Sequence, residues 1–140
     1  MKPTEFIKTV FQDKPAQCGA ACLCMILNYY GMNLTLEDIC FKYPVKDTGC
    51  NAGDIMRGAK DYGFLCRGFR IDMEKACEIP TPAILHWNYN HFVVLESFDG
   101  NYYYVNDPEV GRIRVSPATM DDCFTGVCMT FEPNLKNTEK

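Results

Sequence analysis

The order of two hydrophobic patterns along the chain most strongly limits its fold. Good helix formers crowd the segment Cys18–Tyr30, and Gly31 supplies a stop signal directly after it. Apolar residues then recur at helical spacing from about Gly53 to Tyr62. The second half instead carries five strand-type segments, which are Ala83–Trp87, His91–Phe98, Tyr102–Asn106, Arg112–Ser116 and Gly126–Glu132. Helices followed by antiparallel strands predict an α+β fold, formed as one domain over residues 1–133.

Local capping and turn signals mark the ends of several elements. A second helix is expected to begin at Thr35, whose hydroxyl can cap the first turn, with Asp38 three residues further on. Asp99-Gly100 predicts a hairpin turn between two strands, and Pro117 predicts one short helix before the last strand. The polar residues 134–140 are expected to form a tail or the start of a linker.

Composition and charge exclude several classes of protein. The 140 residues are 47% hydrophobic and 23% charged, which is the balance of a folded globular domain. Acidic residues outnumber basic ones by 18 to 14, so the basic face that a nucleic-acid binder needs is not expected. The longest unbroken apolar run, Ala20–Leu27, is far shorter than the roughly 20 residues of a membrane-spanning helix. Met1–Val10 mixes charged and apolar residues, unlike a secretory signal.

The nine cysteines are expected to stay reduced. Their number is odd, and without a secretory signal the expected compartment is the reducing cytosol. Cys18, Cys22 and Cys24 lack the paired C-x-x-C spacing of a zinc site, and the chain has only two histidines, His86 and His91. We therefore expect no metal site, and we interpret most of the cysteines as small buried hydrophobic residues.

Cys18 differs from the other cysteines in its position, because a polar loop containing Pro15 runs directly into an apolar helix at this residue. A cysteine at a helix N-terminus faces unpaired backbone amides and the positive end of the helix dipole, and both favour the nucleophilic thiolate. Gly19 follows and would let a substrate backbone approach closely. Cys18 is therefore a candidate nucleophile, although this segment alone fits a buried structural thiol equally well.

A nucleophilic thiol needs a base, and the base needs a group that orients it. His91 opens one predicted strand, and Asp107 follows 16 residues later at the end of the next, so a hairpin could place the two side by side. The rival base His86 has no acidic residue placed in the same way, and we interpret it as structural or as part of a substrate subsite. Gln12 could donate its side-chain amide to an oxyanion. Taken alone, His91 also fits a rim histidine, Asp107 a turn residue, and Gln12 an exposed loop residue.

Two motifs together resemble the papain-like cysteine peptidase domain at the N-terminus of bacteriocin-processing ABC transporters. The first motif is Gln12, five residues, and then Cys18–Leu23, which continues as an apolar helix ending in Tyr-Gly. The second is His91–Leu95, with the sequence His-Phe-Val-Val-Leu, followed by Asp107-Pro108. The resemblance extends from about residue 12 to residue 133.

Two details qualify this resemblance. Residues 86–91, with the sequence His-Trp-Asn-Tyr-Asn-His, are most similar to the branch that exports lanthipeptides and related modified peptides. Gln17 departs from the family, which usually has an acidic residue immediately before the nucleophile. This departure changes the charge beside the thiol. It is therefore expected to alter how readily the Cys18 thiol ionises and how a substrate binds next to it.

The resemblance implies a papain-like fold, with N-terminal helices packed on an antiparallel sheet, and a Cys-His-Asp cysteine peptidase. Cys18 would attack the scissile carbonyl, and His91 would protonate the leaving amine. Asp107 would orient His91 and steady the imidazolium. Gln12 and the backbone N–H of Cys18 would hold the oxyanion.

The resemblance also implies a substrate class. A ribosomally made precursor, either a bacteriocin or a lanthipeptide, would be cut just after a Gly-Gly or Gly-Ala pair, with its helical leader in a hydrophobic groove. Gly19, Trp87 and Tyr89 are the expected substrate-binding residues, the two aromatic ones as walls of a channel that admits only small side chains. The sequence alone fits Trp87 and Tyr89 equally well as core or exposed aromatic residues.

The implied partners are the precursor peptide and the transmembrane and ATPase domains of the same transporter. The domain would then work at the cytoplasmic face of the membrane and would be soluble in isolation. Residues 134–140 would tether it to the transmembrane and ATPase parts, which this sequence does not contain. The sequence would accordingly be either an excised domain or a standalone relative. No metal or cofactor is expected, and ATP would bind only at the absent ATPase domain.

Three alternatives remain open at this point. The domain could be a catalytically weak module that only recognises the leader. It could be an acyltransferase with the same Cys-His-Asp geometry, although the sequence has no phosphate-binding loop for a thioester donor. A zinc or redox protein is the third alternative, which the scattered cysteines do not favour. A fast reaction of one thiol with iodoacetamide would indicate a nucleophile, whereas a redox or zinc set would react as a group.

Overall fold

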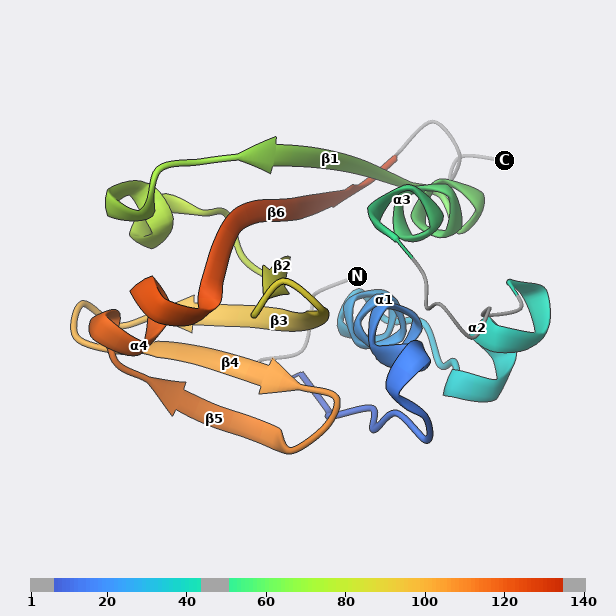
Figure 1. Cartoon of the computed structure of the whole chain (residues 1–140). Helices are drawn as coiled ribbons and strands as arrows, with labels where there is room; N and C mark the ends of the chain where they lie inside the picture. Colours follow the sequence, from blue (N-terminus) through green and yellow to red (C-terminus); the bar gives the residue numbers. More distant parts are fainter. Residues whose placement is uncertain (1–6, 44–50, 135–140) are drawn as a thin grey trace.

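Six antiparallel strands form one sheet in the order β1-β6-β2-β3-β4-β5 (Figure 1). The structure is a computed structural model and describes residues 7–43 and 51–134. The strands are β1 (Phe64–Arg70), β2 (Ala83–Trp87), β3 (His91–Phe98), β4 (Tyr103–Asp107), β5 (Gly111–Val115) and β6 (Phe124–Pro133). The helices are α1 (Cys18–Tyr29), α2 (Leu36–Lys42), α3 (Ala52–Asp61) and α4 (Pro117–Cys123), with two 3-10 helices, η1 (Pro15–Gln17) and η2 (Met73–Glu78).

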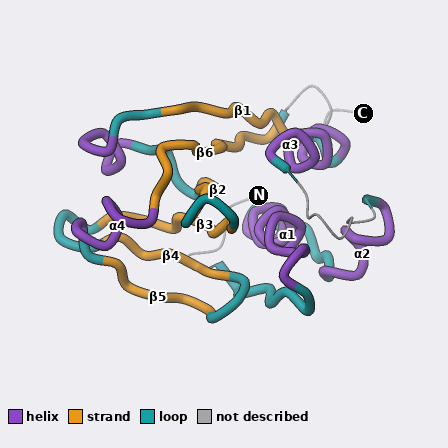
Figure 2. Tube along the Cα trace, viewed as in Figure 1, coloured by secondary structure: helices purple, strands orange, loops and turns teal. Residues whose placement is uncertain are grey.

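Helix α1 is the central helix of the fold, and its first ten residues, Cys18–Leu27, are all buried. Burial on every side follows from its neighbours, because β3 packs along one side of α1 while α2 and α3 pack along others. Figure 2 shows α1, α2 and α3 grouped beside the strands, with α4 at the opposite end of the sheet. The predicted α+β architecture, helices packed on a curled antiparallel sheet, is confirmed.

The two faces of the sheet bury separate apolar clusters, because successive side chains of a strand point to opposite faces. Ile84, Phe92 and Val94 pack with α1 in the first cluster. Leu85 and Val93 pack in the second cluster, which Ala76 of η2 and Met120 of α4 complete. The strands of the middle of the sheet are thus covered on both faces, which holds the ends of β3 and β4 in place.

Several predicted boundaries match the structure. The bounds of β2 and β3 are those read from the sequence, and α1 ends one residue before the predicted end. Thr35 caps α2 as expected: its Oγ1 accepts the Asp38 N–H at 3.1 Å, and Asp38 Oδ2 accepts the Thr35 N–H at 2.8 Å. An equivalent capping box, between Asn51 and Asp54, begins α3 and was not predicted.

Strand β1 corrects the sequence prediction, which placed no strand between α3 and β2. It forms the edge of the sheet and pairs along its whole length with β6. Only Phe64 among its seven residues is buried, and Arg67, Gly68 and Arg70 remove the apolar alternation by which strands are recognised. The predicted tail lies outside the described residues, apart from Asn134, whose N–H donates to the Gly63 carbonyl at 2.8 Å. Within the described ranges, no helix is long and apolar enough to cross a membrane.

Candidate active site

Cys18 is the first residue of α1, at the point where η1 and the preceding loop deliver the chain into the apolar helix. Its side chain is buried, with 7% of its surface exposed, and it forms a hydrogen bond with His91. Other thiols have a different environment, since burial raises the pKa of Cys24 and of Cys66 to about 11. Those two thiols remain protonated at neutral pH, whereas Cys18 is held against a base.

His91 and Asp107 meet as the hairpin between β3 and β4 predicts. His91 is the first residue of β3 and Asp107 the last of β4, and the two strands pair antiparallel. His91 Nε2 lies 2.7 Å from Asp107 Oδ1, and the side chains are only 13% and 10% exposed. Nδ1 is then the ring nitrogen available for the Cys18 thiol. The three side chains form one hydrogen-bonded series with the imidazole in the middle.

The surroundings of His91 favour its charged form. Burial lowers the pKa of His91, but the hydrogen bonds to Asp107 and Cys18 and the charges on these two groups raise it by more, to about 9. The imidazolium is therefore the stable form at neutral pH, ready to act as a proton donor. The pKa of the second histidine shifts in the opposite direction, since burial is the largest influence on His86 and lowers its pKa.

The Asp107 carboxylate forms hydrogen bonds with two different partners. Its Oδ1 accepts the backbone N–H of Glu109 at 2.8 Å, so it shapes the turn into β5 while it contacts His91. The turn role and the orienting role, which were alternatives in the sequence, are combined in one carboxylate. His91, Asp107 and the exposed Glu109 also form a group whose potential metal-ligand atoms lie within 4.8 Å of one another. Because Asp107 Oδ1 already accepts two hydrogen bonds, we interpret this group as polar contacts of the turn, and the absence of a metal remains a prediction.

Gln12 lies in the loop before α1 and is attached to the turn after Asp107. Its backbone N–H donates to the Pro108 carbonyl at 2.9 Å. Its side-chain Nε2 donates to the Lys14 carbonyl at 3.2 Å, while Oε1 is buried and has no hydrogen-bond partner among residues 7–43 and 51–134. An amide nitrogen carries two N–H groups, so Nε2 can hold Lys14 and still donate to a substrate oxygen. The loop that leads to Cys18 and the turn that follows Asp107 are thus joined.

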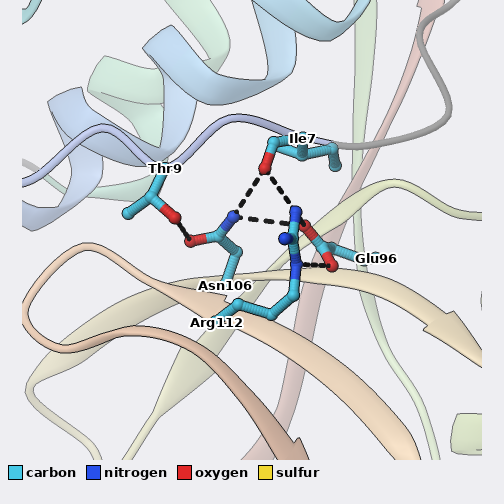
Figure 3. A network of polar contacts seen from close by, with 5 residues as sticks. All are labelled: Ile7, Thr9, Glu96, Asn106 and Arg112. Carbon is cyan, nitrogen blue, oxygen red and sulfur yellow. Dashed lines mark hydrogen bonds and ion pairs between the residues drawn. The ribbon is translucent and has the colours of Figure 1, made fainter.

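A buried polar network, which the sequence did not predict, fixes the segment that leads to Gln12 (Figure 3). Fully buried Asn106 donates from Nδ2 to the Ile7 carbonyl at 3.0 Å, and its Oδ1 accepts from Thr9 Oγ1 at 2.9 Å. Arg112 Nη2 donates to the same Ile7 carbonyl at 2.6 Å and to Glu96 Oε2 at 2.9 Å. Asn106 immediately precedes Asp107, so the network connects the N-terminal segment to the strand that carries the orienting carboxylate.

A cavity of about 500 Å³ lies between the start of α3 and the turn from β2 to β3. Its lining includes Asn90 and Phe92, the two sequence neighbours of His91. His86 also lines it and is tied by Nδ1 to Thr125 Oγ1 at 3.0 Å. The remaining lining residues are Asn51, Ala52, Arg70, Tyr89, Thr125 and Val127. The cavity is therefore a recess of the described surface that adjoins the His91 end of the sheet.

The three expected substrate residues occupy different environments. Tyr89 lines the cavity, is 79% exposed and has a left-handed backbone with φ of 64°. Trp87 does not line it, because the alternation of β2 turns Trp87 away from His86 and into the second apolar cluster, where it is 5% exposed. The expected wall at Trp87 is thus not found at this cavity. Gly19 is buried in the first turn of α1, next to Cys18.

The buried Cys-His-Asp series, at the end of a helix packed on a curled antiparallel sheet, defines a papain-like cysteine peptidase. Residues 7–136 match the Peptidase C39 family, and the chain belongs to that family. It is 36% identical to a crystallised double glycine motif protease from an AMS/PCAT transporter, solved in complex with the leader peptide. That structure has a TM-score of 0.87 and covers 95% of this chain and 96% of its own.

Two sequence relatives are secretion or transport proteins that are much longer than this chain. A probable microcin-H47 secretion/processing ATP-binding protein of Escherichia coli is 32% identical over 91% of this chain, which covers 18% of the relative. A lactococcin-G-processing and transport ATP-binding protein of Lactococcus lactis is 29% identical over 92% of this chain and 19% of its own length. The chain therefore spans less than a fifth of the length of these relatives. The peptidase domain of Streptococcus ComA, 24% identical with a TM-score of 0.82 over 91% of this chain and 99% of its own, has the same fold.

Proposed function

We propose that the chain removes the leader from a ribosomally made precursor peptide by cutting after a Gly-Gly or Gly-Ala pair. The observation that carries this proposal is the hydrogen-bonded series Cys18–His91–Asp107. The likeness to a double glycine motif protease in complex with a leader peptide supports the choice of substrate. The segment 86–91 supports a lanthipeptide or a related modified peptide as the exported product.

The proposed reaction has two steps, which are the formation of a thioester on Cys18 and the hydrolysis of that thioester. The Cys18 thiolate attacks the carbonyl of the second small residue, and the oxyanion that forms accepts hydrogen bonds from Gln12 Nε2 and the Cys18 backbone N–H. The His91 imidazolium protonates the leaving amine, and the neutral imidazole then takes a proton from the water that hydrolyses the thioester. Asp107 holds the ring in the orientation that both transfers require.

The cavity beside His91 is the proposed path of the leader. Phe92 and Val127 offer apolar surface there, and Tyr89 stands exposed at its border. A helical leader could place its apolar side chains on this surface and extend only its last residues toward Cys18. A narrow approach to the thiol would then require residues with little or no side chain at the cut.

The domain is further proposed to act within an ABC transporter, at the cytoplasmic face of the membrane. Residues 134–140 would connect it to the transmembrane domain, and ATP would be used only by the ATPase domain. The microcin-H47 and lactococcin-G relatives, of which this chain covers less than a fifth, support this arrangement because their names assign them to secretion or transport together with processing.

Cleavage of synthetic precursors tests the substrate class. Three peptides with one amphipathic leader and a Gly-Gly, Gly-Ala or Val-Val junction are incubated with the domain and followed by mass spectrometry. We expect cuts directly after the first two junctions and none at the third. Equal cleavage of all three, or cuts elsewhere, would contradict the proposed specificity. Leader binding without any cleavage would identify a recognition module instead.

A further inference from the structure

The loop that carries Gln12 is closed by the side chain of Gln17, which directly precedes Cys18. Gln17 Oε1 accepts two backbone N–H groups, from Asp13 at 2.8 Å and from Lys14 at 2.9 Å. Only the oxygen of an amide can accept both, so the orientation of the Gln17 side chain is fixed. Its Nε2 then faces the Cys40 sulfur of α2 at 3.9 Å, which is a weak contact.

The same loop binds both glutamines at one carbonyl. The backbone N–H of Gln17 donates to the Lys14 carbonyl at 3.0 Å, and Gln12 Nε2 donates to that carbonyl at 3.2 Å. The side chain of Gln12 is therefore bound to Lys14, a residue that Gln17 holds at both its backbone N–H and its carbonyl. The distance between the Gln12 amide and the Cys18 thiol depends on this closed loop, because Gln17 is bonded covalently to Cys18.

We propose that Gln17 is a positioning residue for the oxyanion hole, which places Gln12 Nε2 opposite the carbonyl that Cys18 attacks. This inference rests on the proposed peptidase reaction. The required property of the side chain is an acceptor oxygen at the position of Oε1, and a neutral amide supplies it without adding charge beside the thiol. A glutamate can supply the same acceptor, so the loop tolerates either residue while the charge next to Cys18 differs.

Two substitutions separate the acceptor from the shape of the side chain. Gln17→Met keeps the length but removes the acceptor, and Gln17→Glu keeps the acceptor. Asn101→Met is the matched control for exchanging an amide for a thioether, because Asn101 lies in the exposed β3–β4 turn, at the opposite end of these two strands from His91 and Asp107. Thermal melting of each variant shows whether the fold is retained.

Two reactions of Cys18 report different parts of the site. Peptide cleavage needs the oxyanion hole, whereas alkylation by iodoacetamide needs only the thiol and His91. For Gln17→Met we expect kcat for the Gly-Gly peptide to fall by about 10-fold to 100-fold, because a displaced oxyanion donor loses most of its effect. KM and the alkylation rate are expected to stay within about twofold of the wild type, and Gln17→Glu to restore most of kcat.

Unchanged kcat in Gln17→Met, or alkylation that falls in parallel with cleavage, would overturn the proposal. So would a Gln17→Glu variant no better than Gln17→Met. A dipeptide aldehyde, acetyl-Gly-glycinal, provides a readout independent of leader cleavage, since its adduct with Cys18 places an oxygen in the oxyanion hole. If the wild type cuts no leader peptide, the proposed function fails, but the aldehyde still tests the role of Gln17. Weaker aldehyde binding by Gln17→Met than by wild type and Asn101→Met would support that role, and equal binding would contradict it.

Discussion

Replacing Asp107 by asparagine should leave the turn intact and make the activity strongly dependent on pH. An asparagine Oδ1 can still accept the Glu109 N–H, which Asp107 accepts at 2.8 Å, so the geometry of the β4–β5 turn is preserved. The charge that favours the His91 imidazolium is lost. Burial lowers the pKa of His91, and the contacts with Asp107 and Cys18 together raise it from 6.5 to about 9. Without the carboxylate, this pKa should return toward 6.5.

The size of the effect follows from the protonated fraction of His91. At pH 8 an imidazole with a pKa of about 9 is roughly 90% protonated, whereas one with a pKa of about 6.5 is roughly 3% protonated. The variant should therefore lose about 30-fold in kcat/KM at pH 8 but less than about twofold at pH 6. The assay is peptide cleavage by wild type and Asp107→Asn between pH 5.5 and 10, with thermal melting as the folding control.

The pH profile can refute this reasoning in two ways. The wild type should lose activity as the pH rises through about 9, because a raised pKa means that the proton leaves His91 only there. An alkaline limb that stays in place in Asp107→Asn would show that the carboxylate does not set the charge of His91. An equal loss at pH 6 and pH 8 would show that orientation alone is impaired.

Two further predictions concern the buried network and the thiols. Asn106→Ala should lower the free energy of unfolding by about 2–4 kcal/mol, because the Ile7 carbonyl and Glu96 each lose a hydrogen bond donated by a fully buried amide and Thr9 Oγ1 loses its acceptor. Urea denaturation measures the loss, and a change below about 0.5 kcal/mol would contradict this prediction. Brief labelling of the native domain with iodoacetamide, read by peptide mass mapping, should modify Cys18 well before Cys24, whose pKa burial raises to about 11. Equal labelling of these two cysteines would remove the distinction between the nucleophile and the structural thiol.

The parts of the fold that local rules govern could be predicted from the sequence. The capping pair Thr35 and Asp38 locates the start of α2, and the apolar runs of β2 and β3 locate strands buried on both faces. His91 and Asp107 could be paired because a hairpin with a short turn allows few registers. These signals act within a few residues or across one hairpin, which is the range that a single sequence reveals.

Contacts between distant segments could not be predicted in this way. Edge strand β1 depends on β6, which comes more than fifty residues later, and its own pattern carries two arginines and a glycine. Asn106 is the last residue of a predicted strand, and no local signal indicates that its side chain binds the Ile7 carbonyl, 99 residues earlier in the chain. The place of Trp87 in the second apolar cluster has a related reason, since the face on which a strand residue lies depends on which face its neighbours cover.

The most direct test of the central claim compares wild type with Cys18→Ala on one precursor peptide with a Gly-Gly junction. The wild type should release the core peptide with its first residue directly after the pair, and Cys18→Ala, which should fold and bind the leader equally well, should release none. Cleavage at the same bond by the folded Cys18→Ala variant would contradict the assignment of Cys18 as the nucleophile, and with it the account of the site given above.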